Sequence, residues 1–372
     1  MDVESRNALA TRIVLLCACF LLSAMMAGLM PIPLLYVDGI NILQTKPDLT
    51  VFGSSYEASA YLFAPLFDLL RDFGVRLNAY GRLFNDDQFI VNVVFGAMFF
   101  FGIALQVLGC RLRTDFRNIV SFTFFTVILS PFFFCISKEL VPAWLAIMVL
   151  VMYRSGMLSL RGMFMAYIAL VALCGLYFRV YYLLFALLLL LNWSLDRHRK
   201  VLVLAYVLGA MVLVVVYNKL PLDLINKGRA DYLDGVSNSR IQYLLPDDNG
   251  VGFVGNRFIT LLQLFVPISL LTIGLSYLPY VILQCILTWV MFKRLMDPDR
   301  GLRTFAAHVV FAFTVVGALF EPDFGSYFRH KVGILPFLLL IVAEFEWMDR
   351  RSPCSQNGLE RNQGTSHAKG SG

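Results

Sequence analysis

The sequence predicts an all-α fold, a polytopic transmembrane bundle of about ten helices that forms a single integral membrane domain over residues 1–347. The chain is 59% hydrophobic and only 15% charged, with a mean hydropathy of +0.72. Soluble domains are about 45–50% apolar and about 25% charged. The excess apolar residues occur in blocks of roughly 15–23, near the length that crosses a hydrocarbon layer of ~30 Å.

The apolar blocks give the predicted spans in chain order. The first block, 13–36, is long for a signal peptide and ends in Pro31–Ile32–Pro33 without an A-x-A cleavage site, so it is expected to remain as a span. Several later spans are short, which predicts tilting or local membrane thinning. The spans are placed at 13–36, 89–109, 118–136, 140–153, 163–178, 180–195, 201–217, 277–292, 305–320 and 332–347.

The distribution of charged residues decides whether the block 258–275 is predicted to cross the membrane. This block is apolar enough to span, but Pro267 interrupts it and almost no loop follows it. If it does not cross and the N-terminus is cytoplasmic, 18 of the 31 basic residues and 10 of the 25 acidic residues lie inside. This is the positive-inside bias. The segment 258–275 is therefore predicted to be re-entrant or interfacial, with both termini in the cytoplasm.

Two sizeable segments, 37–88 and 218–257, then face outward. The first contains an amphipathic stretch, Tyr61–Phe73, which is expected to lie among the lipid headgroups. The tail 348–372 is polar and low in complexity, so it is predicted to be a disordered cytoplasmic segment.

Several classes of function are disfavoured by the pattern. No basic stripe with interleaved aromatic residues predicts nucleic-acid binding. The chain contains neither GxxxxGK[ST] nor HExxH, its seven cysteines form no CxxC pair and its four histidines are scattered. We therefore predict no metal and no cofactor.

Charged residues at the predicted outer ends of the spans are the first functional candidates. Placing a charge inside a membrane costs about 2.5–3.5 kcal/mol on insertion scales. Lys138 lies in the turn Ser137–Lys138–Glu139, where a neutralised Lys–Glu pair that closes a hairpin is the alternative. Arg179 lies at the turn between two apolar helices, where it either extends its head into the lipid phosphates or binds a phosphate group of a ligand.

The densest group of acid, base and anion-binding residues is the stretch 321–331. Glu321 and Asp323 flank a proline, and Arg329 and His330 follow within eight residues. A solvated loop with internal ion pairs is the alternative. Further basic residues that could bind an anion, or lie on the solvated surface, occur in the outer segment 218–257 and include Arg240 and Arg257.

The span layout, the turn at 137–139, Tyr177–Phe178–Arg179 and the late segment 320–336 together resemble a known group. They are similar to the polytopic inner-membrane proteins of bacterial capsule, O-antigen and exopolysaccharide clusters, of the repeat-unit polymerase or export type. The resemblance implies glycan transfer at the outer face of the inner membrane. It also implies polyprenyl-diphosphate-linked oligosaccharides as substrates, and the lipid bilayer and other proteins of a polysaccharide assembly system as partners.

The resemblance assigns expected roles to the candidate residues. The cations Lys138, Arg179, Arg240, Arg257 and Arg329 would bind the diphosphate, as fixed positive charge suits a dianion. A sugar hydroxyl that attacks an anomeric carbon benefits from a base, and the candidates for that role are Glu321, Asp323 and His330.

Three other functions stay open at this stage. The first is export or flipping of lipid-linked units, which would need a continuous polar path through the bundle. The second is a glycosyltransferase that uses a polyprenyl-phosphate sugar, with Asp38, just after the first span, as the base. The third is a non-catalytic component of the export complex, in which substitution of these polar residues would be tolerated.

Overall fold

The computed structural model describes residues 3–29, 33–77, 86–219, 239–246, 248–297, 301–321 and 323–346, and within these ranges no β-strand forms. Seven stretches are long and apolar enough to cross a membrane, and they are 6–28, 90–109, 160–177, 199–219, 275–295, 302–320 and 324–342. Four shorter apolar helices accompany them. The predicted all-helical, multi-pass character is confirmed, and the predicted tail 348–372 lies outside the described residues.

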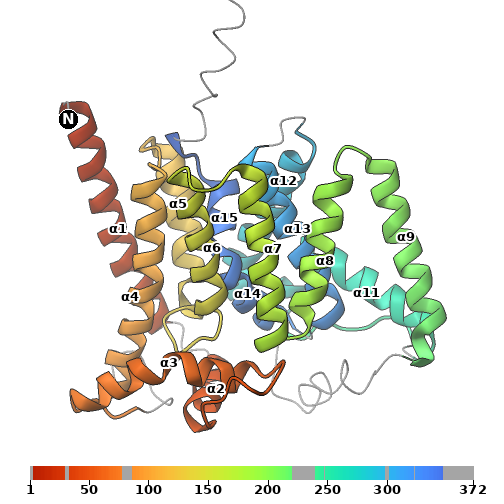
Figure 1. Cartoon of the computed structure of the whole chain (residues 1–372), viewed down its shortest axis with the longest axis horizontal. Coiled ribbons are helices and arrows are strands. Elements are labelled where there is room, and N and C mark those ends of the chain that lie inside the picture. Colours follow the sequence, from red (N-terminus) through yellow and green to blue (C-terminus); the bar gives the residue numbers. More distant parts are fainter. Residues whose placement is uncertain are drawn as a thin grey trace, which may run out of the picture.

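Most of these helices stand side by side in an antiparallel bundle (Figure 1). Short turns join several neighbours in the chain, and a short connection makes two consecutive helices antiparallel. The upright helices are α1 (Val3–Leu29), α4 (Asp86–Gly109), α5 (Phe116–Leu129), α6 (Leu140–Arg154), α7 (Leu160–Tyr177), α8 (Tyr181–Leu195), α9 (Arg199–Val216), α12 (Leu278–Leu295) and α13 (Leu302–Phe320).

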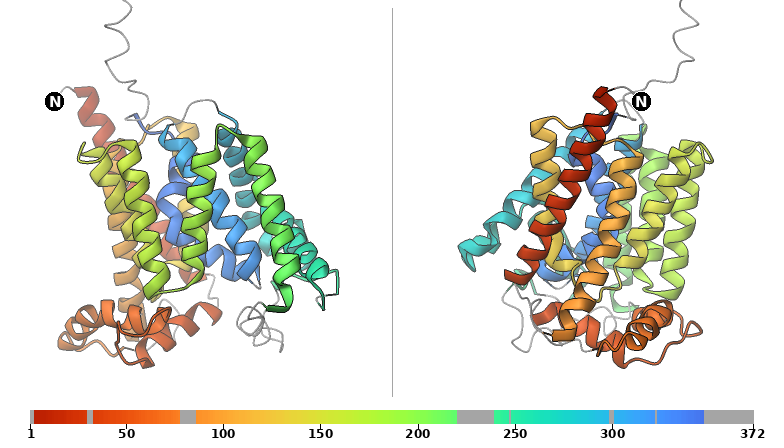
Figure 2. Two further views of the ribbon diagram at one scale, coloured as in Figure 1. Left: turned by 45° about the vertical axis from the view of Figure 1, so that its right-hand side comes forward. Right: turned by 90° about the vertical axis from the view of Figure 1, so that its left-hand side faces the viewer.

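The two ends of the bundle differ in what covers them. At one end, Arg12 of α1 forms an ion pair with Glu346, and Arg113 lies 2.9 Å from Glu344. This end, which joins the first helix to the last described residues, is the terminal end. Two helices, α2 (Pro33–Gln44) and α3 (Ser55–Asp72), lie across the opposite end, which is the cap end (Figure 2).

Amphipathic character explains why α3 lies flat. Its buried face includes Ala58, Phe63 and Phe67, whereas the charged residues Asp68 and Arg71 are exposed. A helix with one apolar face and one polar face packs across a surface instead of passing through it. The helix Ser55–Asp72 contains most of the predicted amphipathic stretch.

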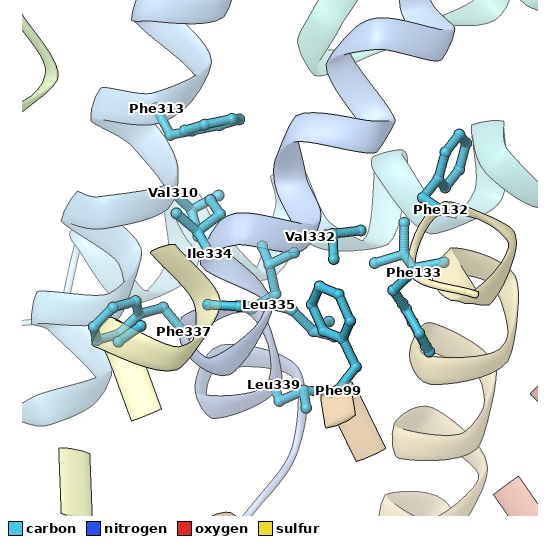
Figure 3. Packing of buried hydrophobic residues seen from close by; sticks show 14 of the residues in the cluster. Phe99, Phe132, Phe133, Val310, Phe313, Val332, Ile334, Leu335, Phe337 and Leu339 are labelled. Carbon is cyan, nitrogen blue, oxygen red and sulfur yellow. The ribbon is translucent and has the colours of Figure 1, made fainter. Parts of the chain in front are cut away.

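The centre of the bundle is formed by α13 and the stretch 324–342. The buried shares of these two spanning stretches are 78% and 89%, against 6% for the stretch in α9 at the periphery. Apolar side chains from several helices interlock there, including Phe99, Val310 and Leu335 (Figure 3). The candidate residues Arg329 and His330 therefore lie on the more deeply buried of these two stretches.

The last stretch is a broken helix made of α14 (Phe324–Lys331), the 3-10 turn η5 (Val332–Ile334) and α15 (Leu335–Val342). Pro336 lies in the first turn of α15, where a missing backbone N–H is tolerated. Gln106 of α4 donates to the Pro336 carbonyl at 2.7 Å, which satisfies a buried backbone group. The sequence places the last span at 332–347, and the structure begins the spanning stretch at Phe324 instead.

The segment predicted to be re-entrant forms α11 (Gly250–Phe265), followed by the short 3-10 turns η3 (Ile268–Thr272) and η4 (Leu275–Tyr277). Asn249 caps α11 by accepting from the Gly252 N–H at 2.8 Å. In Figure 1, α11 runs obliquely instead of parallel to the upright helices. The residue Pro267 that interrupts the apolar pattern lies directly before η3.

Candidate functional site

Charged side chains from four separate segments meet at the cap end. They come from α2, the turn before α6, the turn between α7 and α8, and the region around α14. Six of the seven are buried and Arg179 is half-buried. We call this group the cap-end cluster, and its members are Asp38, Lys138, Glu139, Arg179, Glu321, Arg329 and His330.

Asp38 is the shared partner of two cations. Its Oδ2 atom lies 3.0 Å from Lys138 Nζ and 3.3 Å from Arg329 Nη1, and its Oδ1 accepts from the Tyr56 hydroxyl at 2.8 Å. The Lys138 ammonium also lies 4.6 Å from the centre of the Tyr56 ring. One carboxylate thus holds together α2, α3, the turn before α6, and α14.

The charges around Asp38 shift its titration and that of Lys138. Burial alone would raise the pKa of Asp38, but Arg329, Lys138 and Arg179 hold it well below its ordinary value. Burial and the neighbouring Arg179 lower the pKa of Lys138 to about 7, against the opposing effect of Asp38. Asp38 is therefore ionised near neutral pH, whereas Lys138 is close to giving up its proton.

His330 links the second half of the cluster. Its Nδ1 lies 2.6 Å from Glu139 Oε1, and its Nε2 lies 3.0 Å from Arg179 Nη1 and 3.3 Å from Glu321 Oε1. A guanidinium can only donate, so Nε2 accepts from Arg179, and the ring proton is assigned to Nδ1, which donates to Glu139. A second proton on the ring would instead be donated to Glu321.

Glu139 stays ionised in this setting. Burial alone would raise the pKa of Glu139, but His330, Arg179 and Lys138 outweigh burial and lower it. Its second oxygen accepts from the Tyr182 hydroxyl at 3.4 Å. The predicted Lys138–Glu139 pair of a closed hairpin does not describe this turn, because the two side chains contact Asp38 and His330 instead.

Asp323 has a capping role in the structure. Its Oδ1 accepts from the backbone N–H of Ser326 at 2.9 Å, which satisfies the first turn of α14. Burial raises the pKa of Asp323, and its backbone forms an isolated bridge with Arg240. The Ser326 hydroxyl donates to Glu321, so the start of α14 fixes two of the predicted acids.

The other predicted cations lie apart from these contacts. The Arg240 side chain is exposed, although its backbone pairs with Asp323. Arg257 is buried on α11 and lies over the rings of Tyr243 and Phe253, at 5.1 and 4.6 Å. Of the five predicted anion-binding residues, Lys138, Arg179 and Arg329 belong to the cluster through their contacts with Asp38 and His330.

The deepest cation of the region is Lys331, one residue beyond the cluster. It is fully buried, donates to Gln284 of α12, and lies 4.1 Å from the centre of the Tyr327 ring. Sequence reasoning did not single out Gln284 or Tyr56 as partners. Gln284 is a polar residue on a strongly apolar helix, and this pattern indicates a buried polar partner.

A small cavity adjoins the cluster. Its volume is about 10 Å³, room for about one water molecule. Its lining residues are Ser55, Lys138, Glu139, Pro142, Cys174, Phe178, Arg179 and Tyr182. The cations in this conformation face each other and their carboxylates, so a larger anion must displace some of these contacts to enter.

Comparison with protein-family models, curated proteins and solved structures gives no match for this chain. In the described ranges, no group of three or more His, Cys, Asp or Glu side chains is arranged to hold a metal ion. Among the described residues, the cap-end cluster brings together three cations, three carboxylates and one imidazole, with the hydroxyls of Tyr56 and Tyr182 in contact with its carboxylates.

Proposed function

We propose that this chain transfers a glycosyl group from a polyprenyl phosphate or polyprenyl diphosphate carrier at its cap end. The observation that carries the proposal is the buried carboxylate of Asp38, held between Lys138 and Arg329. Glycosyl transfer with a phosphate leaving group benefits from a base that accepts the proton of the acceptor hydroxyl. It also benefits from fixed cations that stabilise the negative charge of the leaving group.

The proposal includes a topology. About ten helices cross the bacterial inner membrane, both termini are cytoplasmic, and the cap end faces outward. The excess of basic residues near the terminal end supports this orientation through the positive-inside rule. The flat helices α2 and α3 would then lie at the outer surface, where lipid-linked glycans are available.

The three cations would bind the phosphate groups. Arg179 and Arg329 keep their charge at any physiological pH, and their planar donors match phosphate oxygens in pairs. Lys138, with a pKa lowered to about 7, would gain its full charge when a phosphate approaches. An incoming phosphate would compete with Asp38 for Lys138 and Arg329, and so release that carboxylate.

The released Asp38 would act as the base. Once phosphate neutralises its two cations, burial dominates its surroundings, and its pKa rises toward a value suited to accepting a proton. The acceptor hydroxyl gives its proton to Asp38, and its oxygen bonds to the anomeric carbon. The bond from that carbon to the phosphate oxygen breaks, and the electron pair leaves on the phosphate, facing Arg179 and Arg329.

Repeat-unit polymerisation and addition of a single sugar both use this chemistry. In polymerisation the donor carries an oligosaccharide on polyprenyl diphosphate. In the alternative, the donor is a polyprenyl-phosphate sugar. Glu321 and His330 lie 3.3 Å apart and offer a second acid–base pair for either reaction. The apolar packing of Phe99, Leu335 and Leu339 beyond the cluster favours chemistry at one end over passage of a glycan through the bundle.

The test uses purified protein in liposomes with a polyprenyl-diphosphate-linked oligosaccharide, and mass spectrometry of the lipid-linked products. Asp38→Asn is expected to lower kcat by about 10²–10⁴-fold, the usual effect of losing a general base. The KM for the donor should not rise, because the lost carboxylate competes with phosphate. Asp68→Asn is the matched control, since Asp68 is exposed on α3.

Each outcome has a defined meaning. Activity of Asp38→Asn within a few-fold of the unchanged protein would remove Asp38 as the base. A much larger loss with Glu321→Gln would assign that role to the Glu321–His330 pair. If the unchanged protein transfers no sugar from either type of donor, while cells lacking it accumulate lipid-linked units on the cytoplasmic side, the export function would replace the proposal.

A further inference from the structure

An apolar crevice adjoins the polar cavity of the cap-end cluster. It lies between α6, α7, α8 and η5, and Pro142, Cys174 and Tyr182 line both the crevice and the cavity. We call it the α6–α8 crevice, and its lining residues are Pro142, Leu145, Tyr167, Leu170, Val171, Cys174, Tyr182 and Ile334.

We propose that the α6–α8 crevice receives the first isoprene units of the polyprenyl chain while the phosphate of the same lipid lies at Lys138 and Arg179. This inference rests on the proposed function, because it assigns a path to the carrier of that reaction. It adds the route by which the lipid enters the site, sideways from the membrane and between α6 and α7.

The shared residues support one ligand for both spaces. The Tyr182 ring lines the crevice, and its hydroxyl donates to Glu139 at the cluster. Lys138 and Glu139 lie in the turn directly before α6, and Arg179 lies directly after α7, so the helices that form the crevice also hold the charged groups. A molecule with an anionic head and an apolar tail matches this order of polar and apolar lining.

The rim of the crevice faces the surroundings of the bundle. Leu145 of α6 and Leu170 of α7 are half-buried, while Val171 and Cys174 deeper in the crevice are buried. On the same helix, Leu173 and Leu176 are 48% and 44% exposed, as expected of side chains in contact with lipid. The crevice therefore opens toward the hydrocarbon layer instead of toward water.

The size of the crevice favours a thin, flexible occupant. Its volume is about 10 Å³, so it is a narrow slot that must widen on binding. A helix with its side chains is about 10–12 Å across and would not fit between α6 and α7 without separating them. A hydrocarbon chain is far thinner and needs only side-chain movements of Leu145 and Leu170.

The experiment compares two donors that carry the same sugar diphosphate, one on a long polyprenyl chain and one on a methyl group, which is the short-chain donor and has no isoprene unit to enter the crevice. Leu170→Trp fills the rim of the crevice, and Leu176→Trp places the same ring on the lipid-facing surface of α7. Leu170→Trp is expected to raise KM for the long-chain donor about tenfold, as expected for a few lost methylene contacts. The short-chain donor should be little affected, and Leu176→Trp should change neither value.

A second measurement reports binding without catalysis. A photo-cross-linking amino acid at position 170 should capture radiolabelled polyprenyl phosphate, and excess unlabelled polyprenyl phosphate should abolish the capture. The same amino acid at position 176 should capture bulk lipid without such competition. Equal capture of phosphatidylglycerol and polyprenyl phosphate at position 170 would overturn the assignment to a prenyl chain.

The two proposals fail in different ways. If transfer depends on Asp38 but Leu170→Trp and Leu176→Trp behave alike with both donors, the lipid takes another path and the proposed function stands. If polyprenyl phosphate is captured specifically at position 170 but no sugar is ever transferred, the crevice is a binding site for the lipid carrier and the proposed transfer function is wrong.

Discussion

At the residue scale, the proposed function depends on the balance of charge at Asp38 and Lys138. The cluster places three cations against three carboxylates, so removing the carboxylate of Asp38 would take an ion pair from both Lys138 and Arg329. Such a loss costs about 3–5 kcal/mol in buried pairs. Under the proposed function, an incoming phosphate would therefore take over the cations only if a carboxylate were released or protonated.

Lys138 gives this exchange a dependence on pH. Its pKa is lowered to about 7 in the ligand-free protein, and a bound phosphate would raise it. At a pH between the Lys138 pKa of the ligand-free protein and the higher pKa of the complex, binding of phosphate takes up a proton. Affinity for polyprenyl phosphate should therefore fall as pH rises above about 7, by up to about tenfold per pH unit. Isothermal titration at pH 6.5, 7.5 and 8.5, in one ionic strength, measures the slope.

Two variants separate Lys138 from other titrating groups. Lys138→Arg keeps its charge throughout this range, so its affinity should lose the part of the slope that Lys138 contributes. Lys138→Met should bind more weakly and should also lose that part. If all three proteins show the same pH slope, the proton is taken up elsewhere, for example by the ligand itself.

At the element scale, the hairpin of α7 and α8 is what positions Arg179. The Arg179 N–H bonds to the Cys174 carbonyl at 3.1 Å, and the Arg179 carbonyl accepts from the Tyr182 N–H at 2.9 Å. The cap is attached to the same hairpin, since the Gly53 N–H donates to the Leu176 carbonyl at 2.7 Å. The turn therefore orients the side chain proposed to bind phosphate and holds the cap next to it.

This hairpin leaves no room at Gly175. A Cβ atom there would lie 2.8 Å from the backbone nitrogen and 2.6 Å from the Cγ of Leu183. Gly175→Ala must therefore spread α7 and α8, and we expect a loss of about 1–3 kcal/mol in stability, typical of overpacking. Thermal unfolding in detergent measures it, together with loss of polyprenyl phosphate binding as Arg179 moves.

Gly209 provides the matched control on α9. A Cβ atom at Gly209 would meet no atom within 4 Å, and alanine is the better helix former. Gly209→Ala should leave the unfolding temperature unchanged or slightly raised. Equal stability of both alanine variants would show that α7 and α8 are not as closely packed as the structure has them.

At the scale of the whole molecule, the sequence predicts the helices better than their contacts. Apolar blocks and amphipathic periodicity locate the upright helices and α3, because these patterns reflect the local environment of each segment. The last span is displaced toward Phe324, since a hydropathy pattern excludes charged residues such as Arg329 and Lys331. These charges lie in the broken helix because other elements supply partners, among them Asp38 and Gln284.

For the candidate site, too, the sequence predicts the residues better than the contacts between them. Local density of charge points to the stretch 321–331 and to Arg179, but it cannot show which side chains pair. Lys138 and Glu139 are neighbours in sequence and bind different partners, 100 and 191 residues away. The sequence offers Asp38 only as the base of an alternative function, and its central place among the charges follows from how α2 folds over the bundle.

The orientation of the molecule can be tested with single cysteines at its two ends. Phe73 follows α3 at the cap end and is 77% exposed, and Met157 lies in the turn between α6 and α7 at the terminal end and is 70% exposed. In a protein with Cys17 and Cys354 replaced by serine, a membrane-impermeant maleimide should label Phe73→Cys in intact spheroplasts. It should label Met157→Cys only after permeabilisation. Labelling in the reverse order would place Asp38, Arg179 and Arg329 at the cytoplasmic face, and a donor presented on the outer leaflet could then not reach them.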